Sequence, residues 1–345
     1  MAIDCGILFP FRNPDFTRRP WTEIYKDDLD LAVYSEELGF DHVWLTEHHF
    51  VDDGYSPSLM PIACAIAGRT SKIRIGTFVA LLPLHDTVRF AEDVATADVI
   101  SSGRIDLGVG LGYRVAEFAG MGVSSKKRGS KFNEQLPLLR QLLDGESVTL
   151  EGKFHHIEGT KIVPPPAQTP VPLWVGARGD RALDRAANLG CHLAGVSAEH
   201  RIKYRKALEK HGRNPDEYNV SQMVLTYVSD DKTTAWNEAA KPVNHMLQLY
   251  KDWAEEAGDN NNDDQSSRDI PSPEEMMQEQ TCDFFGEPAF IGTADFVYEG
   301  LSQLLERSPC THLVMMGSLP GAPREGTKRN LELLARDVIP RLKEN

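Results

Sequence analysis

The sequence contains little cysteine and no long apolar run. Its 345 residues include five cysteines, none of them arranged as a C-x-x-C pair. This odd, scattered set argues against a disulfide framework or a cysteine-based zinc site, and predicts reduced thiols in a cytoplasmic protein. No stretch approaches the ~18 consecutive apolar residues that indicate a membrane span. The first residues also lack the basic and apolar segments of a signal peptide, so we expect no membrane association.

Positive charge is also scarce. Lys and Arg total 37 against 51 Asp and Glu, which gives a net charge of −14. No basic run offsets this charge, so nucleic acid and anionic membranes are not expected as partners. Residues 251–290 alone hold twelve acidic and two basic side chains, a local charge of −10. Within them, residues 257–280 are polar and without structural pattern, and we interpret them as a lid over an active face in preference to an inert insertion.

Several catalytic signatures are missing. There is no H-E-x-x-H motif and no H-x-H after the first expected strand, so a metal centre is not predicted. A serine hydrolase is disfavoured because no G-x-S-x-G elbow occurs. Gly110 and Gly112 follow a strand, but the third glycine and the later acidic residue of a dinucleotide fingerprint are lacking. The remaining possibility is a site in which a bound cofactor supplies the chemistry.

Strand-like and helix-like segments alternate along the whole chain. The expected strands are 3–9, 42–45, 73–82, 105–109, 171–175, 191–194, 218–228 and 312–316. The expected helices are 22–38, 57–70, 86–100, 132–143, 180–188, 198–211, 231–256 and 325–338. Eight such units predict an α/β fold, specifically a (β/α)8 TIM barrel forming a single domain over residues 1–345. A hairpin at about 147–157 and the long acidic segment at 250–290 are predicted as insertions.

Polar residues gather directly after the second expected strand. Glu47, His48 and His49 come there, and His85 follows the third strand. In an α/β barrel these strand ends carry the chemistry. Two imidazoles beside a carboxylate are costly to bury for packing alone, but a loop-shaping role stays open beside a catalytic one. Adjacent histidines on an extended segment point in opposite directions, so they do not readily share one ion.

The turn Gly176-Ala177-Arg178-Gly179-Asp180 follows the fifth expected strand and opens a helix. Free N–H groups at such a helix start bind anions, and Arg178 adds a positive fork. The turn therefore predicts phosphate binding. The alternative is that Asp180 caps the helix and Arg178 is only solvated. Gly110 and Gly112 are interpreted as a close approach of backbone to a flat or anionic ligand.

Several segments form a more specific combination. These are FDHVWLTEHHF at 40–50, Gly76-Thr77 with Pro83 and His85, Ala91-Glu92-Asp93, SGRIDLGVGLGY at 102–113, Gly292-Thr293, and Asp337-Val338-Ile339-Pro340. Together they resemble the bacterial luciferase-like flavin monooxygenases over essentially the whole chain. The resemblance implies a (β/α)8 barrel, usually dimeric, that holds reduced FMN and uses O2.

The resemblance also implies roles for individual residues. His48 matches the catalytic histidine and His85 a second active-site histidine, with Glu47 beside them. The cofactor-binding residues it implies are Phe78, Val79, Gly110, Leu111, Gly112, Tyr113, Gly176, Ala177, Arg178, Gly179 and Asp180. Among these, the Phe78–Val79 bond matches a non-proline cis peptide under the isoalloxazine ring.

Two positions depart from the luciferase pattern. Leu111 stands where the luciferase proper has an arginine that grips the phosphate, so Arg178 or Arg114 is expected to take that role. Gly110 replaces a reactive cysteine, and light emission is therefore not implied.

The implied activity is that of a monooxygenase. Reduced FMN, supplied by a separate flavin reductase because no nicotinamide motif is present, forms a C4a-hydroperoxyflavin with O2. This species oxygenates a small organic substrate such as an aldehyde, ketone or alkene. Two alternatives stay open, a deazaflavin- or FMN-dependent dehydrogenase on the same barrel and a non-catalytic flavin-binding protein. A cytoplasmic homodimer is expected.

Overall fold

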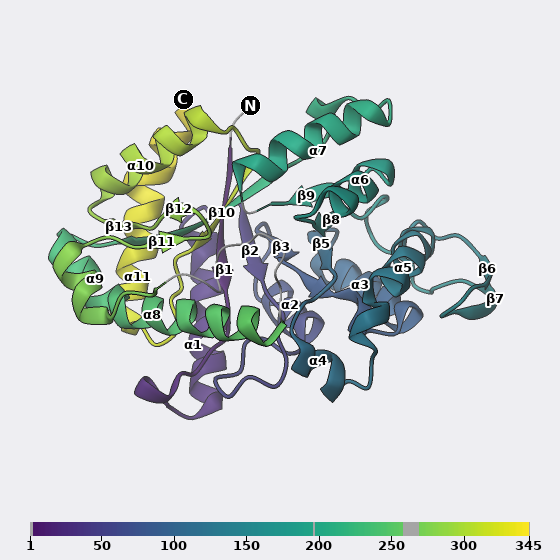
Figure 1. Cartoon of the computed structure of the whole chain (residues 1–345), viewed down its shortest axis with the longest axis horizontal. Coiled ribbons are helices and arrows are strands. Elements are labelled where there is room, and N and C mark those ends of the chain that lie inside the picture. The colour runs from purple at the N-terminus through teal and green to yellow at the C-terminus, as the bar shows by residue number, and fades with distance from the viewer. Residues whose placement is uncertain (1–2, 196, 258–268, 345) are drawn as a thin grey trace.

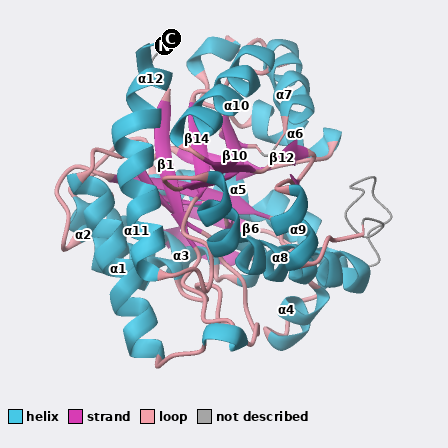
Figure 2. Cartoon of the chain, turned by 90° about the vertical axis from the view of Figure 1, so that its left-hand side faces the viewer, coloured by secondary structure: helices cyan, strands magenta, loops and turns pink. Residues whose placement is uncertain are grey.

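Parallel strands form a curled sheet at the centre of the molecule, and helices surround it (Figures 1 and 2). The computed structural model describes residues 3–195, 197–257 and 269–344. The strands of this sheet are β1 (Asp4–Phe9), β2 (His42–Leu45), β3 (Arg74–Thr77), β4 (Ala80–Leu81), β5 (Ile105–Gly110), β8 (Leu173–Gly176), β9 (His192–Ala194), β10 (Ser221–Val228), β13 (Phe290–Gly292) and β14 (His312–Met316).

The sheet closes on itself. Its strands follow the order β13-β10-β14-β1-β2-β3-β5-β8-β9, and β4 pairs with β5. A parallel bridge between Leu193 and Val220 connects β9 back to β10, and the backbone N–H of Leu193 donates to the carbonyl of Asn219 at 3.0 Å. The fold is therefore α/β and TIM-barrel-like, as the alternation in the sequence predicts.

Helices and two small hairpins complete the described chain. The helices are α1 (Trp21–Glu37), α2 (Leu59–Ala67), α3 (Thr87–Ser101), α4 (Val115–Gly120), α5 (Arg128–Leu143), α6 (Asp180–Asn188), α7 (Ala198–Lys210), α8 (Lys232–Ala257), α9 (Pro273–Glu279), α10 (Ala294–Arg307), α11 (Arg324–Leu333) and α12 (Ile339–Glu344), with a π-helical turn at Leu334–Val338 between the last two. The hairpins are β6 (Val148–Glu151) with β7 (His156–Thr160), and β11 (Asp283–Phe284) with β12 (Glu287–Pro288). The first of them confirms the expected hairpin and projects from the barrel (Figure 1).

Side chains alternate between the two faces of the barrel strands. In β1, Ile7 and Phe9 belong to the large apolar core under the helices, whereas Leu8 belongs to a second cluster inside the barrel. Trp44 and Trp174 fill the middle of that interior, with ring centroids 5.7 Å apart. The barrel centre is therefore packed with side chains and is not a pore.

Glycines on the neighbouring strands make room for Trp44. A Cβ added at Gly76 would lie 2.2 Å from the Trp44 ring, and one at Gly6 would lie 2.6 Å from its Nε1. Any side chain at either position would displace the indole. The two glycines and the tryptophan therefore form one packing unit in the barrel.

The prediction of one continuous strand at 73–82 is wrong, because this segment forms two strands. β3 ends at Thr77, a cis peptide joins Phe78 to Val79, and β4 begins only at Ala80. The backbone N–H of Leu81 donates to the Glu47 carboxylate at 2.6 Å. β4 itself pairs with β5, so the chain leaves the ladder only at Phe78 and Val79.

The acidic insertion is more structured than its composition indicates. Residues 273–279 of the expected patternless run form α9, with Pro273 in its first turn. Ser272 and Glu275 form a capping box at its start, a signal for a helix that the sequence analysis missed. It also missed α4, α10 and the β11–β12 hairpin. Residues 258–268 of the predicted lid lie outside the described residues.

The five cysteines are free thiols, as the sequence predicts. Burial raises the pKa of Cys5 to about 12, so this thiol stays protonated and packs as an apolar group. Among the described residues, no helix combines the length and the apolar character that crossing a bilayer requires.

Candidate active site

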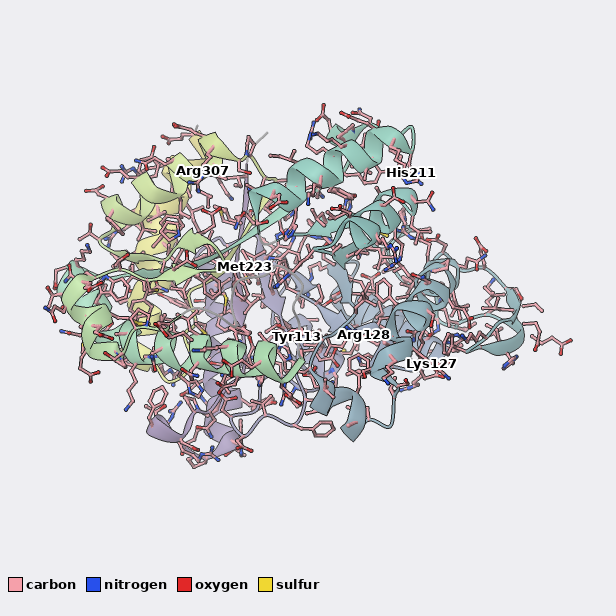
Figure 3. The ribbon with its side chains drawn as sticks, in the orientation of Figure 1. Tyr113, Lys127, Arg128, His211, Met223 and Arg307 are labelled. Carbon is pink, nitrogen blue, oxygen red and sulfur yellow. The ribbon has the colours of Figure 1, made fainter. Side chains whose placement is uncertain are left out.

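A cavity of about 960 Å³ opens at the carboxyl ends of the barrel strands. Every cofactor-binding residue that the resemblance implies lines it, namely Phe78, Val79, Gly110, Leu111, Gly112, Tyr113, Gly176, Ala177, Arg178, Gly179 and Asp180. Glu47 and His48 line it as well, whereas His85 lies behind Glu47. Figure 3 shows Tyr113, Arg128 and Met223 near the middle of the molecule, where these walls meet, and His211 and Arg307 at the periphery.

His48 is held by a carboxylate on the short helix α4. Its Nδ1 donates to Oε1 of Glu117 at 2.8 Å, and Glu117 is fully buried. The same oxygen accepts the backbone N–H of His49 at 3.0 Å. The described residues offer Nε2 of His48 no hydrogen-bond partner, so this nitrogen is available to a molecule in the cavity. The sequence analysis missed Glu117.

Two aromatic rings pack against the His48 imidazole. Its ring centroid lies 4.6 Å from that of Trp253 and 4.7 Å from that of Tyr55. Trp253 belongs to α8, the helix that leads into the acidic insertion. The imidazole therefore sits in an apolar surrounding with one polar anchor, and its orientation is fixed before any ligand binds.

Glu47 joins its own loop to the segment that contains Leu81 and His85. Its carboxylate accepts from Nε2 of His49 at 2.8 Å, from Nε2 of His85 at 2.9 Å, and from the backbone N–H of Leu81 at 2.6 Å. Burial favours the neutral acid, but the hydrogen bonds from His49 and His85 outweigh it and lower the pKa of Glu47 to about 2. An ionised carboxylate with both oxygens engaged is suited to holding its neighbours in place. The two adjacent histidines contact different carboxylates, as their predicted opposite directions require.

Arg114 does not take the role that the sequence analysis allowed it. Its guanidinium is buried, donates to the backbone carbonyl of His49 at 2.6 Å, and stacks 4.6 Å from the ring of Trp253. It is not among the residues that line the cavity. Tertiary packing thus uses the charge of Arg114 behind the cavity wall, and Arg178, which lines the cavity, stays the predicted phosphate partner.

Gly110 leaves room for the side chain of Val79. A Cβ at Gly110 would lie 2.5 Å from Cγ2 of Val79, and one at Gly176 would lie 3.3 Å from both Val79 methyl groups. The interpretation of Gly110 as room for a ligand is thus incomplete, since Val79 after the cis peptide occupies that room. Gly112 has a φ of +70°, a conformation that glycine adopts without strain.

One end of the cavity is rich in cationic side chains. It contains Arg178 and the first turn of α6, whose N-cap is Gly179 and not Asp180. Asp180 instead pairs with Lys203 of α7 at 3.2 Å. The further lining residues at this end, which the sequence analysis missed, are Arg128, Arg181, Arg185, His200 and Lys203. Helix-start N–H groups with several cations nearby form a site for an anionic group.

The ordered part of the acidic insertion contributes to the cavity wall. Tyr250 of α8 and Phe285 at the β11–β12 turn both line the cavity, and their rings lie 5.4 Å apart. The hydroxyls of Tyr250 and Tyr55 share a hydrogen bond, and the Arg178 guanidinium stacks 5.3 Å from the Phe285 ring. These contacts connect the insertion with the cationic end and with the surroundings of His48.

Comparison with known protein families agrees with this geometry. The model of the family described as luciferase-like monooxygenase matches residues 3–312. The chain belongs to this family. Luciferase-like proteins include monooxygenases that bind FMN as well as F420-dependent dehydrogenases and reductases, so a flavin-type cofactor suits the cavity described above.

Individual luciferase-like proteins show how wide the likeness is. The oxygenase component of flavin-dependent trigonelline monooxygenase from Acinetobacter baylyi is 26% identical over 67% of the chain. An F420-dependent glucose-6-phosphate dehydrogenase from Nakamurella multipartita is 32% identical over 58% of it. The chain spans 66% and 63% of these two relatives, which is under two thirds of each. The monooxygenase RslO1 from Streptomyces bottropensis shares the fold, with a TM-score of 0.83, 24% identity, and coverage of 98% and 99% of the two chains.

Proposed function

We propose that the protein is a flavin-dependent monooxygenase that uses reduced FMN and O2 to oxygenate a small organic substrate such as an aldehyde, ketone or alkene. The observation that carries this proposal is the His48 imidazole, anchored through Nδ1 and presenting Nε2 to a cavity with apolar and aromatic walls. A bound reduced flavin supplies the electrons that activate O2.

The residues of the chain divide the remaining tasks. Nε2 of His48 holds or moves a proton next to the reacting groups, which is the usual contribution of a positioned histidine. Glu117 orients this ring. Tyr55 and Trp253 exclude water from it, which protects reactive species from hydrolysis. Phe78 and Val79 supply an apolar surface for a flat ring system.

We also propose a separate flavin reductase as the source of reduced FMN. The trigonelline monooxygenase supports this by analogy, because it is the oxygenase component of its system. The acidic insertion supports a lid, since its ordered residues Tyr250 and Phe285 already form cavity wall. A homodimer is part of the proposal and is testable by light scattering.

The activity is tested with purified protein, a flavin reductase, FMN, a nicotinamide donor and ¹⁸O₂. A panel of aldehydes, ketones, alkenes and N-heterocyclic acids is analysed by mass spectrometry. Incorporation of one ¹⁸O atom into a product, dependent on the protein, is the expected result. Products that lack ¹⁸O, or turnover that continues without oxygen, contradict the monooxygenase proposal.

The cationic end of the cavity favours a second candidate, a deazaflavin-dependent dehydrogenase. Arg128, Arg181 and Arg185 line the cavity in addition to Arg178, and together they supply more positive charge than one FMN phosphate needs, whereas Lys203 is paired with Asp180 and Glu199. A coenzyme with a more anionic tail, such as F420, suits this surplus. The dehydrogenase from Nakamurella multipartita uses this coenzyme. Anaerobic titration with F420 and FMN separates the candidates. Tighter binding of F420 together with oxygen-independent substrate oxidation reverses our ranking.

Arg178→Ala is expected to weaken FMN binding by about 10- to 100-fold, because a charge-assisted contact contributes roughly 1.5–3 kcal/mol. Riboflavin lacks the phosphate, so its affinity changes much less, and added salt narrows the difference between the two flavins. Fluorescence titration measures both affinities. Arg205→Ala is the matched control, because Arg205 pairs with Asp216 on the surface and lies outside the cavity. Equal losses for FMN and riboflavin contradict a phosphate contact.

A further inference from the structure

A second cluster of polar side chains lies at the opposite end of the barrel, where the strands begin. Asp4, His42 and His312 come from β1, β2 and β14, and Asp4 is the register partner of His312. Each offers one ligand atom, and these atoms lie within 4.8 Å of one another. Both histidines are buried, whereas the Asp4 side chain is 44% exposed. The cluster is thus closed inside the barrel and open to solvent on one side.

The hydrogen bonds around His312 leave a lone pair facing a carboxylate. The Thr311 hydroxyl donates to the carbonyl of Val220 at 2.9 Å, so the 2.8 Å contact between this hydroxyl and Nδ1 of His312 places the ring proton on Nδ1. Nε2 then carries the lone pair and lies 3.3 Å from Oδ2 of Asp4. Two acceptors at this distance need a proton or a cation between them.

His42 presents a second lone pair. Its Nε2 lies 3.3 Å from Oδ2 of Asp106, a carboxylate that Arg74 and the indole N–H of Trp174 also contact. With the ring proton on Nε2, Nδ1 becomes the acceptor, and this atom is buried without a hydrogen-bond partner among the described residues. A histidine whose other nitrogen is held by a carboxylate is the usual arrangement at metal sites.

We propose that Asp4, His42 and His312 bind one divalent transition-metal ion, through two imidazole nitrogens and one carboxylate oxygen. This donor set suits Zn²⁺ and related ions. Tetrahedral coordination places donors about 3.4 Å apart, and the pair formed by His312 and Asp4 already has that spacing. The three ligand atoms lie within 4.8 Å of one another, so they must move closer together to bind one ion. Water reaches the fourth position along the exposed side of Asp4.

The site is independent of the flavin cavity, because Trp44 and Trp174 lie between the two. The ring of His42 stacks 5.1 Å from Trp44, and that of His312 lies 4.8 Å from Trp174. A paramagnetic ion in the site therefore quenches tryptophan fluorescence. This gives a readout that needs neither activity nor a variant.

The test uses the full chain after chelator treatment. Titration with Co²⁺ is expected to quench tryptophan fluorescence at one equivalent, and Zn²⁺ is expected to reverse the quenching and to raise the melting temperature. Asp4→Asn and His312→Gln are expected to weaken Co²⁺ binding by about tenfold or more. His211→Gln, which changes a surface histidine paired with Asp184, is expected to leave it unchanged.

Three results overturn the proposal. They are less than half an equivalent of Co²⁺ bound by the wild type, unchanged affinity in Asp4→Asn, and an equal loss in His211→Gln. Asp4→Asn decides the matter if His312→Gln does not fold, because the partly exposed Asp4 tolerates an isosteric change.

Discussion

Replacing His48 with glutamine is expected to lower turnover by about 10²- to 10⁴-fold, the usual contribution of general acid–base help. Glutamine keeps a polar group of similar length, but it cannot exchange a proton near neutral pH. The packing against Tyr55 and Trp253 is largely kept, so the fold and the flavin affinity should change little. The measurement compares product formation by the two proteins, using the substrate identified with ¹⁸O₂, at saturating reduced FMN.

Two comparisons make this result specific to His48. His211→Gln alters a histidine at the periphery (Figure 3) and should retain full turnover. Glu117→Gln keeps an acceptor for Nδ1 but removes its charge, so it should lose less than His48→Gln. Unchanged turnover in His48→Gln, or loss of its flavin binding, would assign His48 a structural role.

Replacing Glu47 with glutamine is expected to lower the free energy of unfolding by about 3–5 kcal/mol, as for breaking a buried ion pair. The amide of glutamine turns an N–H group toward one of three donors, His49, His85 or the backbone N–H of Leu81. Urea denaturation measures the change. Glu151→Gln is the control, since Glu151 contacts His156 on the exposed hairpin and should contribute at most about 1 kcal/mol.

The contribution of Glu47 should also depend on pH in a defined direction. The pKa of Glu47 is lowered in the folded protein from 4.5 to about 2. A carboxylate with a lowered pKa stabilises the folded protein at pH values above its pKa in the unfolded chain. This stabilisation is lost as the pH falls through the pKa of the folded protein. The difference between wild type and Glu47→Gln should therefore shrink by about 3 kcal/mol as the pH falls from 4.5 to 2. A difference that stays constant over this range contradicts the ionised pair.

The barrel and one wall of the cavity could be predicted from local sequence. A buried strand is recognised as a short apolar run in the sequence, independently of its neighbours in space. The residues that follow such a strand, for example Glu47 and His48, must then lie at its carboxyl end. Glu117 could not be predicted, because its role arises only when α4 folds back against the loop that follows β2. Arg114 shows the same limit, since a cation in the sequence carries no sign of whether Trp253 will cover it.

The cis peptide illustrates a different limit. Phe78 and Val79 read as ordinary strand residues, and only the family resemblance predicted the bond that interrupts the strand. Its support comes from Gly110 and from Glu47, which contacts Leu81, and both lie far from it in sequence. Local propensity has no access to such long-range contacts.

Two walls of the cavity belong to different parts of the chain. Phe78 and Met223 are tied to the barrel strands, whose ladder tolerates little change, whereas Tyr250 and Phe285 come from an insertion outside that ladder. Substitutions in the insertion can therefore change one wall of the cavity while the barrel strands stay constant. A combinatorial library restricted to Tyr250 and Phe285 therefore varies this wall of the cavity, and with it substrate preference, without altering the strand ladder.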